Sequence, residues 1–243
     1  MKKVIWSLFD SETAITQELN NENYIVYSIG LASSSAITDN FISMDLSKKS
    51  CLKKLEKLPK PDIIFSSPPC ETWVMVNIGN VVHFKRNFNE RNLYWQKNFK
   101  GNDFTIKHKE LRLLGQKTAY YTFKIIQKFN SELWCIENGS SSLIFKYLYK
   151  FHSLIGNQNK TYYSSYDNIN FGRKPTTIYS NLKMNLRQDF KHSNIATCDH
   201  LTGNKRGTKE VRMNYCERSK VPIQLYKHIL EIYEGKQQLN LDL

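Results

Sequence analysis

The sequence has no apolar run approaching the roughly 20 residues that a membrane-spanning helix needs. Its first residues, Met1-Lys2-Lys3-Val4-Ile5-Trp6, lack the long apolar core of a secretory signal peptide. Internal repeats and low-complexity linkers are also absent, which excludes repeat and fibrous architectures. We therefore expect a globular protein of the reducing cytoplasm, without a membrane partner, that buries one substantial core.

Paired cysteine spacing is also missing. The chain has five cysteines, an odd number, at Cys51, Cys70, Cys135, Cys198 and Cys216. This pattern excludes a small domain held together by disulfides. Zinc-binding residue types do occur together, at His192, Cys198, His200 and Cys216, but the Cys-x-His spacing is not that of a zinc finger. We expect polar loop residues there and no metal.

Acidic residues are few compared with basic ones. The chain carries 35 Lys and Arg against 22 Asp and Glu, a formal net charge of +13. A surplus of this kind suits a polyanionic partner such as DNA, although it says nothing about sequence preference. The segment 83–117 is strongly basic and has aromatic residues between its charges, which is typical of a loop that contacts DNA. A solvated surface segment whose aromatics pack on the domain is the alternative.

One cysteine stands in an unusual context. The apolar run Asp62-Ile63-Ile64-Phe65 is followed by Ser66-Ser67-Pro68-Pro69-Cys70. The two prolines fix φ and prevent a helix before them, so the segment after this strand is stiff and extended. A stiff turn can direct a thiol into a cleft. The alternative is that Cys70 is a small apolar core residue.

Two more segments place charged residues at the ends of predicted strands. Leu133-Trp134-Cys135-Ile136 is a short buried strand that leads into Glu137-Asn138, and Arg173 precedes the strand-forming residues Thr177-Ile178-Tyr179. In open α/β sheets, ligands bind beyond the carboxyl ends of the strands. We therefore expect Cys70, Glu137 and Arg173 to face one pocket.

The order of predicted elements supports an α/β fold. Strands are predicted at residues 4–8, 24–29, 62–65 and from 133, and helices at 12–19, 111–129, 143–151 and from about Pro222 to Ile232. Ser140-Ser141-Ser142 is expected to cap the third helix. Strands that alternate with helices pair in parallel.

The chain resembles the DNA (cytosine-5) methyltransferases, in particular their short phage and mobile-element versions. The likeness rests on five blocks in family order, covering nearly the whole chain: Ser7-Leu8-Phe9-Asp10, Ser67-Pro68-Pro69-Cys70, Glu137-Asn138, Phe171 to Asn181, and Glu217 to Pro222. It implies a Rossmann-like methyltransferase with a mostly parallel seven-stranded sheet. The catalytic domain would span residues 1–181, a small target-recognition region 182–216, and a closing helix 217–243.

The resemblance also implies a chemistry. Cys70 would add as a thiolate to carbon 6 of a cytosine rotated out of the duplex, Glu137 would bind ring nitrogen N3, and Arg173 would bind the exocyclic oxygen. The methyl donor would be S-adenosylmethionine. The partners would be double-stranded DNA and a cognate restriction endonuclease, in a bacterial or phage-infected cell, and we expect a monomer. Restriction–modification and antirestriction roles are both open.

The cofactor turn departs from the family. Ser11 and Thr13 stand in place of its two glycines, and Gly30 follows the second strand where an acidic residue is usual. The expected cofactor-binding residues are Phe9, Asp10, Ser11, Glu12, Thr13, Asp45 and Pro68. The expected DNA-binding residues are Lys85, Arg86, Arg91, Lys174, Lys205 and Arg206.

Three hypotheses account for this departure. The first is an active enzyme whose cofactor contacts are altered, with Asp10 or Glu12 in a polar role. The second is a catalytically inactive relative that acts as a DNA-binding or decoy protein. The third is an amino-methyltransferase, which would need Asn or Asp and an aromatic residue around its prolines, where this chain has Cys70 and Glu71.

Overall fold

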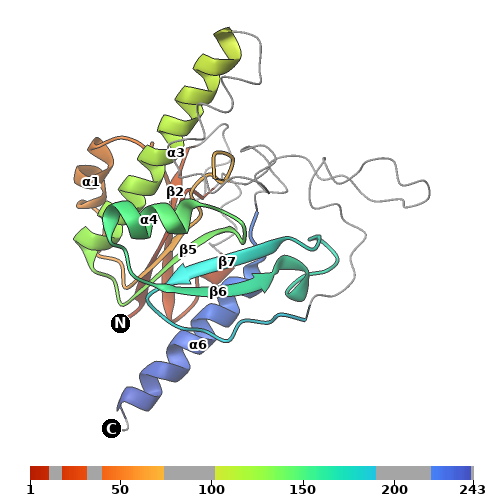
Figure 1. The fold of residues 1–243 in the computed structure, drawn as a ribbon. Helices are drawn as coiled ribbons and strands as arrows, with labels where there is room; N and C mark the ends of the chain where they lie inside the picture. The colour runs from red at the N-terminus through yellow and green to blue at the C-terminus, as the bar shows by residue number, and fades with distance from the viewer. Residues whose placement is uncertain (11–17, 32–39, 74–101, 190–219, 242–243) are drawn as a thin grey trace.

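The computed structural model describes residues 1–10, 18–31, 40–73, 102–189 and 220–241, and Figure 1 shows how they are arranged. These residues form one seven-stranded sheet with the order β3-β2-β1-β4-β5-β7-β6. The strands are β1 (Lys3–Leu8), β2 (Tyr24–Gly30), β3 (Phe41–Ser43), β4 (Ile63–Ser66), β5 (Leu133–Gly139), β6 (Asn157–Tyr162) and β7 (Pro175–Ser180).

Pairing is parallel from β3 through β2, β1 and β4 to β5, and β7 then runs antiparallel to both β5 and β6. The central strands are apolar on both faces because helices cover both, as is usual for parallel sheets. The mostly parallel, seven-stranded sheet predicted for a Rossmann-like methyltransferase is thereby confirmed.

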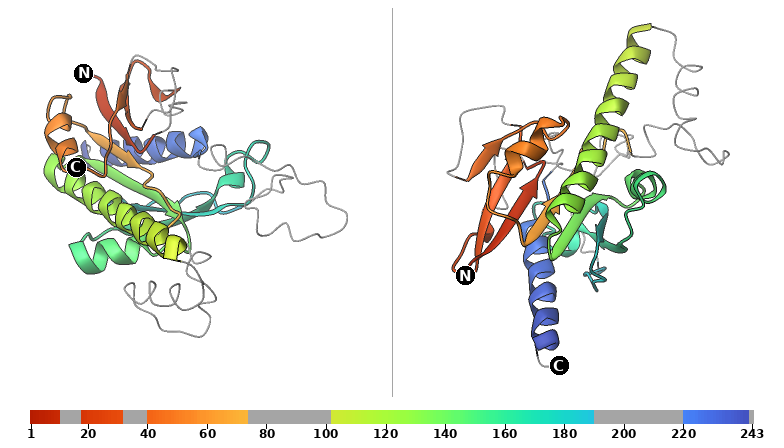
Figure 2. Two further views of the ribbon diagram at one scale, coloured as in Figure 1. Left: turned by 90° about the horizontal axis from the view of Figure 1, so that it is seen from above. Right: turned by 90° about the vertical axis from the view of Figure 1, so that its left-hand side faces the viewer.

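Helices lie on both faces of the sheet (Figure 2). One face is covered by α1 (Ser50–Leu55), α3 (Asn102–Phe129) and α4 (Ile144–His152), and the other by α6 (Ile223–Leu241). A short 3-10 turn, η4 (Tyr163–Ser165), follows β6. Among the described helices, none combines the length and the apolar character needed to cross a membrane.

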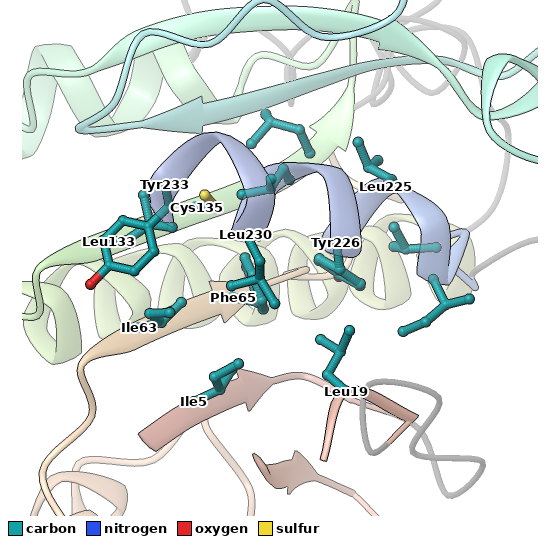
Figure 3. Packing of buried hydrophobic residues seen from close by; sticks show 14 of the residues in the cluster. Ile5, Leu19, Ile63, Phe65, Leu133, Cys135, Leu225, Tyr226, Leu230 and Tyr233 are labelled. Atoms are coloured by element: carbon teal, nitrogen blue, oxygen red, sulfur yellow. The ribbon is translucent and has the colours of Figure 1, made fainter. Parts of the chain in front are cut away.

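The core on the α6 face is built by alternate residues of the strands. Ile63, Phe65, Leu133 and Cys135 point toward α6 and are buried against its side chains, as Figure 3 shows. The α6 residues in this core are Ile223, Leu225, Tyr226, Ile229, Leu230 and Tyr233. The opposite residues of the same strands, such as Ile64 and Trp134, pack beneath α1, α3 and α4. This alternation fixes which strand residues can face a site on the α6 side.

Two helices differ from their predicted extents. The predicted helix 111–129 begins earlier, at Asn102, so part of the basic segment 83–117 is helical and not a loop. Its residues 102–110 include Lys and Glu and no Gly or Pro, which favours continuing the helix. The closing helix begins after Pro222, as predicted, and continues past Ile232.

The predicted serine cap of α4 is shifted by local geometry. Leu143 already has helical φ and ψ and takes the cap position without a side-chain hydrogen bond. Ser142 Oγ instead accepts a hydrogen bond from the backbone N–H of Ile144 at 3.3 Å. Ser142, the residue before the cap position, thus binds a backbone N–H in the first turn of α4. The predicted helix 12–19 lies mostly outside the described residues.

Removing packing beneath α6 should destabilise the whole domain. We expect Leu225→Ala, at a fully buried position, to lower the free energy of unfolding by about 2–5 kcal/mol, because it leaves a cavity. Urea unfolding followed by circular dichroism measures this loss. The exposed Ile169→Ala serves as the control and should change stability by less than about 0.5 kcal/mol. Equal midpoints for the two variants would contradict this account of the core.

Candidate active site

The segment that carries Cys70 follows β4, and Glu137 lies near the end of the neighbouring strand β5. Strands β4 and β5 are parallel neighbours, with Ser66 opposite Ile136. Directly beyond this pair, Asn138 Nδ2 donates a hydrogen bond to the backbone oxygen of Pro68 at 3.0 Å. Asn138 and Pro68 are both buried. The proline segment is therefore fastened to the end of β5 at the edge where both strands finish.

Cys70 begins a tight turn that packs against α3. The backbone N–H of Trp73 donates to the oxygen of Cys70 at 2.9 Å, and the Trp73 ring is buried. A Cβ at Gly115 would lie only 2.1 Å from Thr72 Oγ1, so the close approach of α3 to this turn requires glycine there. The Cys70 side chain itself is partly exposed, as a nucleophile must be.

Opposing effects act on the Cys70 thiol. Burial raises its pKa most, and the negative charges of Glu137 and Glu71 raise it further, whereas the positive charge of Lys174 lowers it. The net direction is upward. The protein without substrate therefore holds mainly the protonated thiol at neutral pH.

Glu137 is a buried carboxylate with two neighbours on one oxygen. The Tyr163 hydroxyl donates to Oε1 at 2.6 Å, and Lys174 Nζ lies 3.9 Å from the same atom. Glu137 has the same parity in β5 as Cys135, so it points to the α6 face. Burial and the adjacent carboxylate raise the pKa of Tyr163, so its phenol stays protonated and remains a donor.

The two cations before β7 behave differently. Arg173 is exposed, and its guanidinium carbon lies 5.1 Å from the centre of the Tyr162 ring. Lys174 is half-buried beside Glu137, and its Nζ lies 4.5 Å from the centre of the Tyr163 ring. The role of Arg173 toward the exocyclic oxygen of a base stays a prediction. Lys174, which the sequence assigned to DNA, is the cation beside Glu137.

Helix α6 also reaches the site. The Tyr226 hydroxyl lies 3.3 Å from Ser67 Oγ, and its ring lies 4.5 Å from that of Phe65. Burial raises the pKa of Tyr226 well above its usual value. Tyr163 and Tyr226 had no sequence signal beyond being aromatic, so neither was assigned to the site from the sequence.

A cavity of about 260 Å³ lies next to the proline segment. Its walls come from the ends of β1, β2 and β3 and from α3: Phe9, Asp10, Gly30, Leu31, Met44, Asp45, Leu46, Ser47, Pro69, Leu114 and Thr118. Three residues predicted to bind the cofactor, Phe9, Asp10 and Asp45, are among them. Pro68 is instead buried beside Asn138, and Ser11, Glu12 and Thr13 lie outside the described residues.

The loop after β1 crosses to the end of β2 within this cavity. The N–H of Asp10 donates to the oxygen of Ile29 at 3.2 Å, and a Cβ at Gly30 would lie 2.1 Å from the Asp10 carbonyl oxygen. Phe9 has a φ of 61°, in the left-handed region that is unfavourable for a bulky side chain. Asp10 thus occupies the place from which a residue 30 side chain would project.

Asp45 is largely engaged in its own turn. Its Oδ1 accepts hydrogen bonds from the backbone N–H of Ser47 at 2.9 Å and from Ser47 Oγ at 2.6 Å. Although burial alone raises its pKa, these bonds and the charge of Lys48 bring the pKa below its usual value. The cavity walls are otherwise mostly apolar. A mostly apolar lining that includes two aspartates, Asp10 and Asp45, suits an adenosine group, so the residues present fit S-adenosylmethionine.

Other predicted residues lie outside the described part of the chain. These are the expected DNA contacts Lys85, Arg86, Arg91, Lys205 and Arg206, and the zinc-type residues His192, Cys198, His200 and Cys216. Within the described ranges no group of three or more side chains could hold a metal ion. Residues 182–189, placed with the recognition region, pack on the sheet: Met184 and Leu186 are buried in the α6-side core.

Comparisons with known proteins find similarity among solved structures. No family model and no curated protein sequence matches the chain. A protein described as a DNA modification methyltransferase encoded within an E. coli prophage shares 11% identity, with a TM-score of 0.43 and coverage of 83% of this chain and 55% of that one. The Entamoeba histolytica methyltransferase EhMeth shares 14%, with a TM-score of 0.47 and coverage of 81% and 60%.

The S. pombe Dnmt2 methyltransferase shares 12% identity, with a TM-score of 0.43 and coverage of 76% of this chain and 52% of that one. This chain therefore spans between 52% and 60% of the length of the three structures. Similarity at this level does not establish an activity, which the residues of the site themselves must support.

The hydrogen bond between Asn138 and Pro68 should contribute to the free energy of unfolding. We expect Asn138→Ala to lower the free energy of unfolding by about 1–3 kcal/mol, because the buried Pro68 oxygen loses its donor. Denaturant unfolding provides the measurement. Gln127→Ala, at an exposed position on α3, should stay within about 0.5 kcal/mol of the unchanged protein. A loss no larger than that of Gln127→Ala would show that this bond does not hold the segment.

Proposed function

We propose that this protein transfers a methyl group from S-adenosylmethionine to carbon 5 of cytosine in DNA, through a covalent Cys70 adduct on a flipped-out base. One observation carries the proposal: the Cys70 segment and Glu137 are fastened together at the ends of β4 and β5, beside a cavity that reaches Pro69. A partly exposed thiol, a buried carboxylate and a cation thus occupy one edge of the sheet.

The chemistry assigns a role to each side chain. The Cys70 thiol gives its proton to solvent, and the resulting thiolate forms a bond to carbon 6, which moves the electron pair of the C5–C6 double bond onto carbon 5. Glu137 binds N3 and stabilises the charge that develops on the ring. After carbon 5 gains the methyl group, its proton leaves to a base, the C6–S bond breaks and the thiolate is restored.

The cofactor would be held in the cavity beside Pro69. When bound, S-adenosylmethionine supplies an electrophilic methyl group on its sulfonium. Asp10 would bind the ribose in place of the acidic residue missing after β2, with the apolar side chains of Met44 and Leu46 against the adenine. The basic residues Lys85, Arg86, Arg91, Lys205 and Arg206 would contact DNA phosphates.

Covalent trapping tests the role of Cys70. We expect duplex DNA with 5-fluorocytosine at the target to form a stable adduct in the presence of S-adenosylmethionine, because after methyl transfer the fluorine on carbon 5 cannot leave as a proton does. Cys70→Ala should form no adduct and transfer no labelled methyl group, while still retarding DNA in a gel. Denaturing electrophoresis and peptide mapping detect the adduct, and bisulfite sequencing of DNA from expressing cells identifies the target. A protein that binds DNA but never traps it would instead be an inactive DNA-binding relative.

Calorimetric titration tests the cofactor site separately. We expect saturable binding of S-adenosylhomocysteine that weakens about tenfold or more in Asp10→Asn, since hydrogen bonds to charged groups contribute about 1.5–3 kcal/mol. Glu231→Gln, an exposed carboxylate on α6, is the matched control and should bind as the unchanged protein does. Equal affinities in the Asp10 and Glu231 variants would remove Asp10 from the site.

A further inference from the structure

The cation that accompanies Glu137 is not the one that the family resemblance points to. We infer that Lys174, and not Arg173, supplies the positive charge of the catalytic site, where it and Tyr163 hold the Glu137 carboxylate and Lys174 stabilises the Cys70 thiolate. The inference builds on the proposed function in assigning Cys70 as the nucleophile. It concerns a property of the protein alone, which can be measured without DNA or cofactor.

The first support is the geometry around Glu137. Lys174 Nζ lies 3.9 Å from Oε1 of Glu137 and 3.4 Å from the Tyr163 hydroxyl, which itself donates to that Oε1 at 2.6 Å. The ammonium, the phenol and the carboxylate therefore form a closed triangle. A buried carboxylate needs such partners, because an isolated charge in this environment is strongly unfavourable.

The second support is the fixed backbone of Lys174. Its N–H donates to the oxygen of Gly172 at 2.7 Å, and its oxygen accepts from the N–H of Tyr163 at 3.2 Å. Thr176 Oγ1 donates to the same oxygen at 3.3 Å. The carbonyl of Lys174 is thus fixed to Tyr163, the first residue of η4, and the side chain of Lys174 lies beside the ring of the same tyrosine.

The third support is where the neighbouring cation goes. Although Arg173 and Lys174 are consecutive in a turn, Arg173 is exposed, whereas Lys174 is half-buried beside Glu137. The guanidinium lies over Tyr162 on the exposed side. Among the charges of described residues that act on the Cys70 thiol, the cation is Lys174.

The charges of Lys174 and Glu137 have opposite effects on the pKa of the Cys70 thiol. Lys174 lowers the pKa of Cys70, whereas Glu137 raises it, in addition to the larger upward effect of burial. Removing the lysine charge should therefore reduce the thiolate fraction at neutral pH. Removing the Glu137 charge should increase it.

The test is the rate of Cys70 alkylation by iodoacetamide as a function of pH, followed by peptide mass spectrometry so that other cysteines do not interfere. We expect Lys174→Met, which keeps the apolar stem, to move the inflection to higher pH and to slow the reaction at pH 7 by about two- to tenfold. Arg173→Met and the exposed Lys160→Met should leave the inflection in place. Lys174→Arg should restore it.

A second variant separates charge from structural damage. Glu137→Gln should move the inflection to lower pH, opposite to Lys174→Met, and a general loosening of the fold would not produce opposite shifts. An inflection that moves in Arg173→Met but not in Lys174→Met would overturn the inference, as would one that moves in neither. If the inflections shift as expected but 5-fluorocytosine DNA is not trapped, the proposed cytosine chemistry is wrong, whereas the role of Lys174 is supported.

Discussion

The arrangement of this site depends on one buried hydrogen bond, from Asn138 Nδ2 to the oxygen of Pro68. Parallel pairing of β4 and β5 brings the two strands to the same edge, but pairing ends at Ser66 and Ile136. Beyond that point the N–H of Ser67 still donates to the oxygen of Leu8 in β1 at 3.1 Å, and on the β5 side Asn138 binds the oxygen of Pro68. Because two prolines stiffen the chain, fixing Pro68 also restricts where Cys70 can lie.

The charges of Lys174, Glu137 and Glu71 then determine how readily the Cys70 thiol ionises. Burial and the negative charges of Glu137 and Glu71 raise the pKa of the Cys70 thiol, which therefore resists ionisation. The opposing charge comes from Lys174, whose ammonium is near the carboxylate and influences the thiol. A compact ammonium offers a point charge, not the two-pronged contact of a guanidinium. Lys174 can therefore balance the charge of Glu137, but it cannot bind a planar group through two parallel hydrogen bonds.

The sequence predicted those parts that follow from strand position. Ile63 to Phe65 and Leu133 to Ile136 are apolar runs with clear ends, so their neighbouring places at one sheet edge could be inferred. The choice between Arg173 and Lys174 could not, because it depends on the tight turn at Gly172 and the hydrogen bond to Tyr163. Tyr163 itself carried no signal, since its contact with Glu137 joins elements distant in the chain. The early start of α3 was missed because its basic and aromatic residues were interpreted as a DNA-contacting loop.

The end of β2 is shaped by the loop that follows β1. An acidic side chain at position 30 could not coexist with this course of the β1 loop, because the carbonyl of Asp10 lies where its Cβ would be. The position of the Asp10 backbone therefore requires glycine at position 30. The left-handed φ of Phe9 turns the chain from β1 toward β2. The hydrogen bond from the Asp10 N–H to the Ile29 oxygen holds the backbone in this conformation. The cavity beside the end of β2 is therefore lined by Asp10, a residue that follows the neighbouring strand β1.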